Sequence, residues 1–216
     1  MASCTTEQDL GSHARMQTEG GTTDEGGSLD ASSDGGLDPS PIDTGRDFRI
    51  VFGTDNLYSG DLRTEGGASS GLEGADRVCN REAADAKLAG RFRAWLSTST
   101  VDARDRIAPV GPWKLVDGTT IFPGSAVTGP PARYLQLTAK GQRIFASNQP
   151  EVWTATLAMG NLNRADHACA DWSSGSADVS GNYGVMVSSD GEWTDAGLSS
   201  SSIPCSARAR LYCFEQ

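Results

Sequence analysis

Short runs of apolar and β-branched residues, separated by turn-forming residues, make up most of the chain after residue 47. Such runs are typical of β-strands bounded by turns. The expected strands cover residues 48–54, 92–97, 152–156, 183–187 and 209–214. Residues 113–122 hold two more short strands, because the Asp117-Gly118 pair between them is a strong β-hairpin signal. Residues 123–150 show no regular pattern, and their four prolines favour irregular structure.

One early segment follows a helical pattern instead. Ser70 precedes Glu73 by three residues, which is the spacing of a capping box at a helix start. We expect the helix over residues 72–88, closed by Gly90. Small residues recur on one face of it together with Cys79, so the Cys79 side chain should point into the core. One early helix, many short strands and long loops predict an α+β domain over residues 47–216.

The charge is unevenly distributed along the chain. Residues 1–46 contain nine Asp and Glu against two Arg, a balance of −7, within a total of −10. The remaining residues contain 19 acids and 16 bases, a balance of −3. Residues 1–46 (the acidic segment) have almost no large apolar side chains and are expected to be a disordered Gly/Ser/Thr tether. The domain has no basic stripe for a phosphate backbone and the sequence no apolar run long enough to span a bilayer, so neither nucleic acid nor a membrane-spanning segment is expected.

Cys4 follows two small residues, Ala2 and Ser3. This resembles the end of a bacterial lipobox, in which the cysteine becomes the lipidated first residue. The other reading is an incidental cysteine. The long polar segment after Cys4 favours lipidation, and with it an exported protein anchored at the bacterial outer surface or in the periplasm.

The other four cysteines are Cys79, Cys169, Cys205 and Cys213, and no two form a Cys-x-x-Cys pair. Their wide spacing disfavours zinc and favours two disulfides, although buried free thiols are the other reading. Four cysteines allow three pairings. A strand between Cys205 and Cys213 would hold their Cα atoms about 26 Å apart, at about 3.3 Å per residue, so a bond between these two is disfavoured. Disulfides imply export.

Candidate catalytic groups are scarce. The two histidines are His13, in the acidic segment, and His167, next to Asp166. Neighbours in sequence rarely face each other, so a solvated or capping role fits His167 better than general-base catalysis. We therefore do not expect an enzyme.

Several motifs together resemble a known family. They are Gly74-Ala-Asp-Arg-Val-Cys79, residues 88–97 with Trp95, Val152-Trp-Thr-Ala-Thr156, Cys169-Ala-Asp-Trp172, and Cys205 with Leu211-Tyr-Cys-Phe-Glu215. Their order and cysteine spacing are similar to endostatin, the C-terminal domain of collagen XVIII and a variant of the C-type-lectin fold. Bacterial endostatin-like lipoproteins, including the leptospiral family, are more similar still. The resemblance covers about residues 48–216 and implies antiparallel strands, one early helix and two nested disulfides, Cys79–Cys213 and Cys169–Cys205.

The resemblance also implies functions, with departures. Bacterial members are proposed to adhere to host matrix proteins and to capture complement regulators. The zinc-binding histidines and basic heparin surface of endostatin have no counterpart here. Gln149-Pro-Glu151 resembles a lectin calcium motif but precedes a strand rather than lying in the long loop. Trp193-Thr-Asp195 is better placed, so Asp195 is a weak calcium candidate, although calcium needs six or more oxygens.

The function expected from the sequence is therefore binding or adhesion. The domain should recognise an extracellular protein or carbohydrate, as a monomer and without a cofactor. The expected ligand surface comprises Trp172, Asp190, Glu192, Trp193 and Asp195. Packing at the edge of the core is the other reading for both tryptophans. The alternative functions are a structural envelope protein without a soluble ligand and a calcium-dependent lectin.

Overall fold

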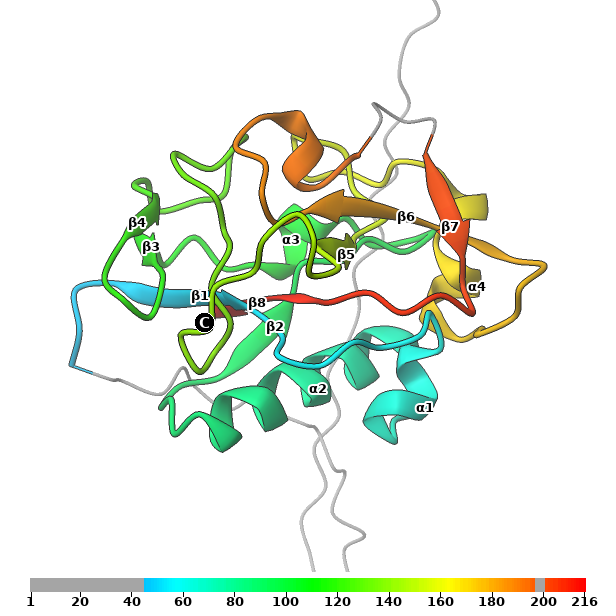
Figure 1. Ribbon diagram of the computed structural model, residues 1–216, viewed down its shortest axis with the longest axis horizontal. Coiled ribbons are helices and arrows are strands. Elements are labelled where there is room, and N and C mark those ends of the chain that lie inside the picture. Colours follow the sequence, from blue (N-terminus) through cyan, green and yellow to red (C-terminus); the bar gives the residue numbers. More distant parts are fainter. Residues whose placement is uncertain (1–44, 197–200) are drawn as a thin grey trace, which may run out of the picture. The chain divides into compact units, whose positions relative to one another are not determined.

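The computed structural model describes residues 45–196 and 201–216. These residues belong to one compact unit, Pro39–Gln216. They form an α+β fold, as the sequence predicts, with two β-sheets and short helices (Figure 1). Cys4, His13 and nearly all of the acidic segment lie outside the described residues.

The larger sheet has five strands in the order β2-β8-β1-β3-β4. The strands are β1 (Arg49–Gly53), β2 (Phe92–Ala94), β3 (Trp113–Lys114), β4 (Thr120–Phe122) and β8 (Tyr212–Glu215). The C-terminal strand β8 pairs antiparallel with both β1 and β2. The sequence predicts antiparallel strands. This prediction is wrong for one pair, because β1 runs parallel to β3. The long connection between β1 and β3 permits this crossover, whereas a short hairpin could not.

The second sheet has three antiparallel strands in the order β5-β6-β7. They are β5 (Glu151–Trp153), β6 (Ser180–Val185) and β7 (Ser202–Pro204). Strand β7 lies in the serine-rich stretch that the sequence assigns to a loop. Its residues pair with β6 although serine is a poor strand former, so the tertiary pairing outweighs the local preference.

The predicted helix is α2 (Gly71–Asp85), which ends three residues earlier than expected. Ser70 caps it by accepting a hydrogen bond from the Glu73 amide at 3.3 Å. The Glu73 carboxylate reaches back to the amide and hydroxyl of Ser69, at 3.1 and 2.7 Å, so the capping box closes one residue earlier than in the standard motif. The face of α2 that carries Cys79 is buried, as predicted.

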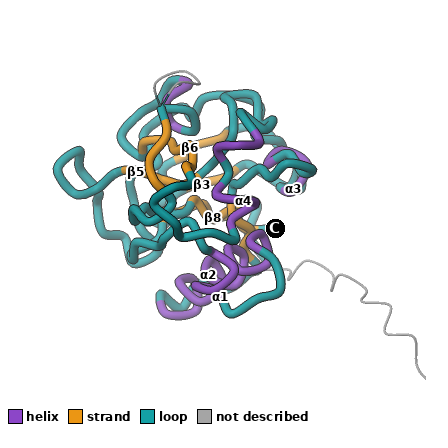
Figure 2. Tube along the Cα trace, turned by 90° about the vertical axis from the view of Figure 1, so that its right-hand side faces the viewer, coloured by secondary structure: helices purple, strands orange, loops and turns teal. Residues whose placement is uncertain are grey.

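A second early helix, α1 (Leu62–Gly66), packs against α2 and was not predicted. Both helices lie on the same side of the strands (Figures 1 and 2). The close approach depends on Gly74, because a Cβ there would overlap the carbonyl of Leu62. The remaining helices are single turns: α3 (Ala103–Arg106), α4 (Cys169–Trp172), η1 (Ala165–His167) and η2 (Gly191–Trp193).

Two disulfides connect these elements, with the predicted nested pairing. Cys79 of α2 bonds to Cys213 of β8, with a Cα–Cα distance of 5.5 Å. Cys169 of α4 bonds to Cys205, just after β7, with a Cα–Cα distance of 5.7 Å. The first disulfide ties α2 to the large sheet and the second ties α4 to the end of the small sheet. All four cysteines are fully buried.

Candidate ligand-binding pocket

The two tryptophans expected on the ligand surface are in the core. Trp172 and Trp193 are both 0% exposed. The Trp172 indole donates a hydrogen bond to the Ser97 carbonyl at 2.8 Å. The Trp193 ring packs against Trp95, with 5.2 Å between the two ring centroids. The ligand-surface prediction is therefore wrong for both residues. Their neighbouring loops are polar, but they fold back so that each indole ring contacts other aromatic rings rather than solvent.

Asp195 is also buried, with 5% of its surface exposed. One of its carboxylate oxygens accepts hydrogen bonds from the side-chain amides of Asn163 and Asn182, at 2.9 and 3.0 Å. This role is structural, because the carboxylate connects the segment before η1 to β6. The described residues contain no group of three or more His, Cys, Asp or Glu side chains that could hold a metal ion. The calcium expectation for Asp195 is not supported by this geometry.

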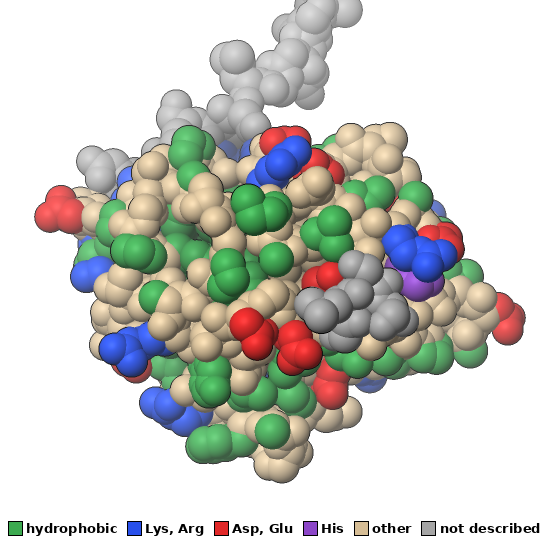
Figure 3. Space-filling model, turned by 90° about the horizontal axis from the view of Figure 1, so that it is seen from above, with side chains coloured by type: hydrophobic (Ala, Val, Ile, Leu, Met, Phe, Trp, Pro, Cys, Tyr) green, Lys and Arg blue, Asp and Glu red, His purple; other side chains and the backbone are tan. Residues whose placement is uncertain are grey.

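Asp190 and Glu192 are exposed at the start of η2. The Asp190 carboxylate accepts hydrogen bonds from the Ser188 hydroxyl and the Glu192 amide, which together hold the pKa of Asp190 below its ordinary value. On the face seen from above, acidic and basic side chains stand singly or in small groups among neutral surface (Figure 3). The five expected surface residues therefore do not form one site: three are buried and two are exposed.

His167 is partly buried in η1, and its Nδ1 has no hydrogen-bond partner in the described part of the chain. Its neighbour Asp166 pairs with Arg164 instead, with 2.8 Å between guanidinium nitrogen and carboxylate oxygen. Within residues 45–196 and 201–216, therefore, no carboxylate orients His167 as a base.

In the part of the chain that the structure describes, one candidate site lies in the stretch that the sequence leaves irregular. Residues 132–145 form a hairpin-like excursion whose two arms meet at the Leu137–Arg143 bridge. Leu135, Leu137 and Ile144 are buried beneath it. The Leu137 carbonyl accepts a hydrogen bond from the Gly53 amide at 2.9 Å, which fixes the excursion to the end of β1. Because side chains alternate along an extended chain, the residues between these anchors face outward.

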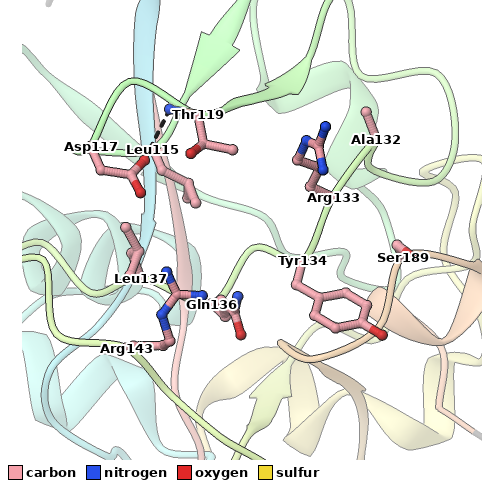
Figure 4. A pocket seen from close by; sticks show the side chains of 10 residues that line it. All are labelled: Leu115, Asp117, Thr119, Ala132, Arg133, Tyr134, Gln136, Leu137, Arg143 and Ser189. Atoms are coloured by element: carbon pink, nitrogen blue, oxygen red, sulfur yellow. Dashed lines mark hydrogen bonds between the residues drawn. The ribbon is translucent and has the colours of Figure 1, made fainter.

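The outward side chains line a pocket of about 410 Å³, named here the Tyr134 pocket. Arg133, Tyr134, Gln136 and Arg143 come from the excursion. Asp117 and Thr119 come from the β3–β4 turn, and Ser189 comes from the segment after β6. In Figure 4, Arg133 and Tyr134 lie on one side, Asp117 and Arg143 lie on the other, and Gln136 lies between them. Three separate chain segments therefore converge on one concave surface.

Some polar side chains of the pocket form hydrogen bonds within the protein, and others do not. Asp117 accepts a hydrogen bond from the Thr119 amide at 2.9 Å, which holds its pKa below the ordinary value, with a further contribution from the charge of Arg143. By contrast, the side chains of Arg133, Tyr134, Gln136 and Arg143 make no hydrogen bond to any described residue. Hydrogen-bond donors without a partner in the protein, gathered in a concave surface beside an exposed aromatic ring, are typical of a ligand-binding site.

The charge around this pocket differs from that of the domain as a whole. Residues 118–150 contain no Asp or Glu but include Arg133, Lys140 and Arg143. They also carry Tyr134 and Phe145, which are 46% and 55% exposed and are two of the three large apolar side chains exposed in the described chain. Two sequence signals could have revealed the site. One is the absence of acids, and the other is the alternation of Leu135 and Leu137 with Tyr134 and Gln136.

A second hollow is lined by three arginines, but most of them already form hydrogen bonds within the protein. Arg81, Arg208 and Arg210 line it together with residues 55–58. Arg210 donates to the carbonyls of Thr54 and Asp55 at 2.6 and 2.7 Å, and Arg208 donates to the carbonyl of Leu57 at 2.6 Å. Two of its three arginines therefore hold the backbone of residues 54–57 in place. We regard this hollow as structural.

The chain matches no protein-family model and no curated protein sequence. In the described residues, no helix is both long enough and apolar enough to cross a membrane.

Proposed function

We propose that this protein is an exported, lipid-anchored binding protein whose domain recognises an extracellular protein or glycan without catalysis. The observation that carries the proposal is the Tyr134 pocket, in which two arginines, a tyrosine and a glutamine present unpaired polar groups next to exposed aromatic surface. A group of this kind can bind and orient a ligand. It contains no nucleophile paired with a base.

We also propose a more specific fold for residues 47–216. The motifs that resemble endostatin, the nested disulfides and the α+β class support an endostatin-like variant of the C-type-lectin fold. In this proposal residues 1–46 are the tether, Cys4 carries the lipid, and the domain acts as a monomer at the bacterial surface. Fold alone does not determine a ligand, so the pocket rather than the resemblance identifies the surface to test.

The test is a binding screen of the full chain against immobilised matrix proteins, complement regulators and a glycan array, with and without calcium. The proposal predicts a saturable interaction with at least one protein or glycan that is weakened in Tyr134→Ala and unchanged in Met159→Ala. Met159 is the matched control, because it is 61% exposed and outside the pocket. Binding that is equal in both variants would place the ligand elsewhere. Complete absence of binding would favour a structural envelope protein.

Lipidation is tested separately. Metabolic labelling with a fatty-acid probe should mark the native precursor and should fail when Cys4 is replaced by Ser. An unlabelled native precursor would remove the anchor from the proposal and leave the binding function untouched.

A further inference from the structure

We infer that the Tyr134 pocket binds an acidic segment of a protein partner, with carboxylates of the partner paired to Arg133 and Arg143. This inference rests on the proposed binding function and names its ligand chemistry. It begins from the two guanidinium groups, which line the same pocket and make no hydrogen bond to any described residue. A guanidinium presents a planar fork of donors that matches a carboxylate in a bidentate pair.

The arrangement of the arginines indicates more than one carboxylate. Arg133 and Arg143 enter the pocket from opposite sides, with Gln136 between them (Figure 4). A ligand with acidic groups spaced along an extended backbone can reach both sides. Gln136 then offers an amide that can both donate to and accept from the peptide backbone of that ligand.

The charges of the residues that line the pocket favour an acidic ligand. Among the described residues, Asp117 is the only acidic one that lines the pocket. One of its carboxylate oxygens accepts a hydrogen bond from the Thr119 amide, and its charge interacts with that of Arg143. Lys140, in the acid-free stretch 118–150, lines an adjoining hollow together with Asp117 and Arg143, but its ammonium is paired with the Asp55 carboxylate at 3.7 Å. Within the pocket, two guanidinium groups therefore outnumber one ionised carboxylate, so an incoming carboxylate meets a net positive charge. Complementary charge of this kind steers association and excludes partners of the wrong sign.

The surroundings favour a protein segment over a long polyanionic chain. Outside the acid-free stretch the domain holds its full complement of 19 acids against 13 of its 16 bases, since Arg133, Lys140 and Arg143 account for the other three. A long polyanion would be repelled once it extended beyond the pocket, whereas a short acidic segment would not. Tyr134 lines the pocket with the two arginines and adds exposed aromatic surface, and Tyr and Arg are among the side chains that most often dominate protein–protein binding energy.

The test measures fluorescence anisotropy with the full chain and two labelled octapeptides, one with four Glu and one Tyr, the other with Gln in place of each Glu. We expect the Glu peptide to bind at least about tenfold more tightly than the Gln peptide, and Arg133→Gln and Arg143→Gln each to weaken it by about tenfold. Arg164→Gln is the matched control, because Arg164 is exposed and already paired with Asp166. It should leave binding unchanged. Thermal unfolding of each variant verifies that the fold persists.

Several results would overturn the inference. They are equal affinity for the two peptides, equal loss in Arg164→Gln, or binding of a hyaluronan oligosaccharide under conditions where the Glu peptide does not bind. Failure of this inference can be distinguished from failure of the proposed function. If a protein found in the screen loses binding in Tyr134→Ala but not in Arg133→Gln or Arg143→Gln, the binding function stands and the acidic ligand is wrong.

Discussion

The guanidinium of Arg46 lies 2.7 Å from the carboxylate of Glu215, the residue before the C-terminus. Glu215 is fully buried, and its other carboxylate oxygen accepts a hydrogen bond from the Ile50 amide at 2.6 Å. The ion pair thus joins the start of the folded domain to its last strand. Arg46 belongs to the acidic segment by composition, yet it neutralises a buried charge of the domain.

This ion pair predicts where the chain can be shortened. Deleting residues 5–44 should leave the melting temperature unchanged, because their composition offers no apolar face. Arg46→Ala should lower the free energy of unfolding by about 2 kcal/mol, since it leaves the Glu215 carboxylate without its cation. The cost is below that of a fully buried pair because the Arg46 side chain is 27% exposed. Urea unfolding measures both. Arg63→Ala is the control. It removes an exposed ion pair, in which 3.9 Å separates Arg63 Nε from Asp61 Oδ1, and it should change the free energy of unfolding by less than about 0.5 kcal/mol.

Glu82 predicts an acid-dependent loss of stability. Its carboxylate is 1% exposed and accepts hydrogen bonds from the amides of Asp55 and Asn56, the Asn56 side chain and the Tyr58 hydroxyl, the last at 2.6 Å. Burial alone would raise the pKa of Glu82, but these hydrogen bonds outweigh it and hold the pKa below 4.5. The folded pKa is thus lower than the unfolded one. The contribution of Glu82 is therefore fully present above about pH 4.5 and is lost as the pH falls through the folded pKa.

Glu82→Gln should therefore lower the unfolding free energy by about 2 kcal/mol at pH 7, and the difference from the natural protein should shrink as the pH falls below 4.5. Chemical unfolding at a series of pH values measures this. Glu192→Gln removes an exposed carboxylate and should leave the pH profile unchanged. A constant difference between Glu82→Gln and the natural protein at all pH values would show that the carboxylate is not linked to stability in this way.

The two buried tryptophans should respond differently to the loss of the indole N–H. The Trp172 Nε1 donates to the Ser97 carbonyl, whereas the Trp193 Nε1 has no hydrogen-bond partner among the described residues. Trp172→Phe leaves a buried carbonyl unsatisfied and should cost about 1–3 kcal/mol more than Trp193→Phe. Thermal or urea unfolding decides the order. A larger loss in Trp193→Phe would mean that ring packing, not the hydrogen bond, sets the difference.

The disulfide that encloses the longer stretch of chain should contribute more to stability, although the contribution grows only with the logarithm of loop length. Cys79 and Cys213 are separated by 134 residues, and Cys169 and Cys205 by 36. On the chain-entropy model, removing the outer bond costs roughly 5 kcal/mol and removing the inner bond roughly 4 kcal/mol. Paired Cys→Ala variants measured by urea unfolding should keep that order. Peptide mapping of the unreduced protein should recover the same two pairs, and a Cys205–Cys213 pair would contradict the fold.

The features that the sequence predicted well depend on local chemistry. Ser70 and Glu73 mark the start of α2 because capping involves neighbours three residues apart. Asp117-Gly118 marks the β3–β4 hairpin because Gly118 takes a positive φ of 87° in the turn. The cysteine pairing was available through the resemblance, and it agrees with the buried face of α2.

The features that it missed depend on distant contacts. The parallel pairing of β1 with β3 has no local signal, since it joins segments over 60 residues apart. Trp172 and Trp193 stand beside polar loops, and only the folded chain shows aromatic rings covering both. The Tyr134 pocket combines three segments that lie far apart in the sequence, and its two arginines belong to no metal-binding or lectin motif.

The most direct test of the binding account is the affinity of the full chain for the protein or glycan that scores best in the screen. It should be measured for the natural protein, the double variant Tyr134→Ala/Arg143→Gln, and the control Met159→Ala/Arg164→Gln. The account predicts that the pocket variant binds at least about tenfold more weakly at an unchanged melting temperature, while the control binds as the natural protein does. Equal affinity of all three proteins would contradict it.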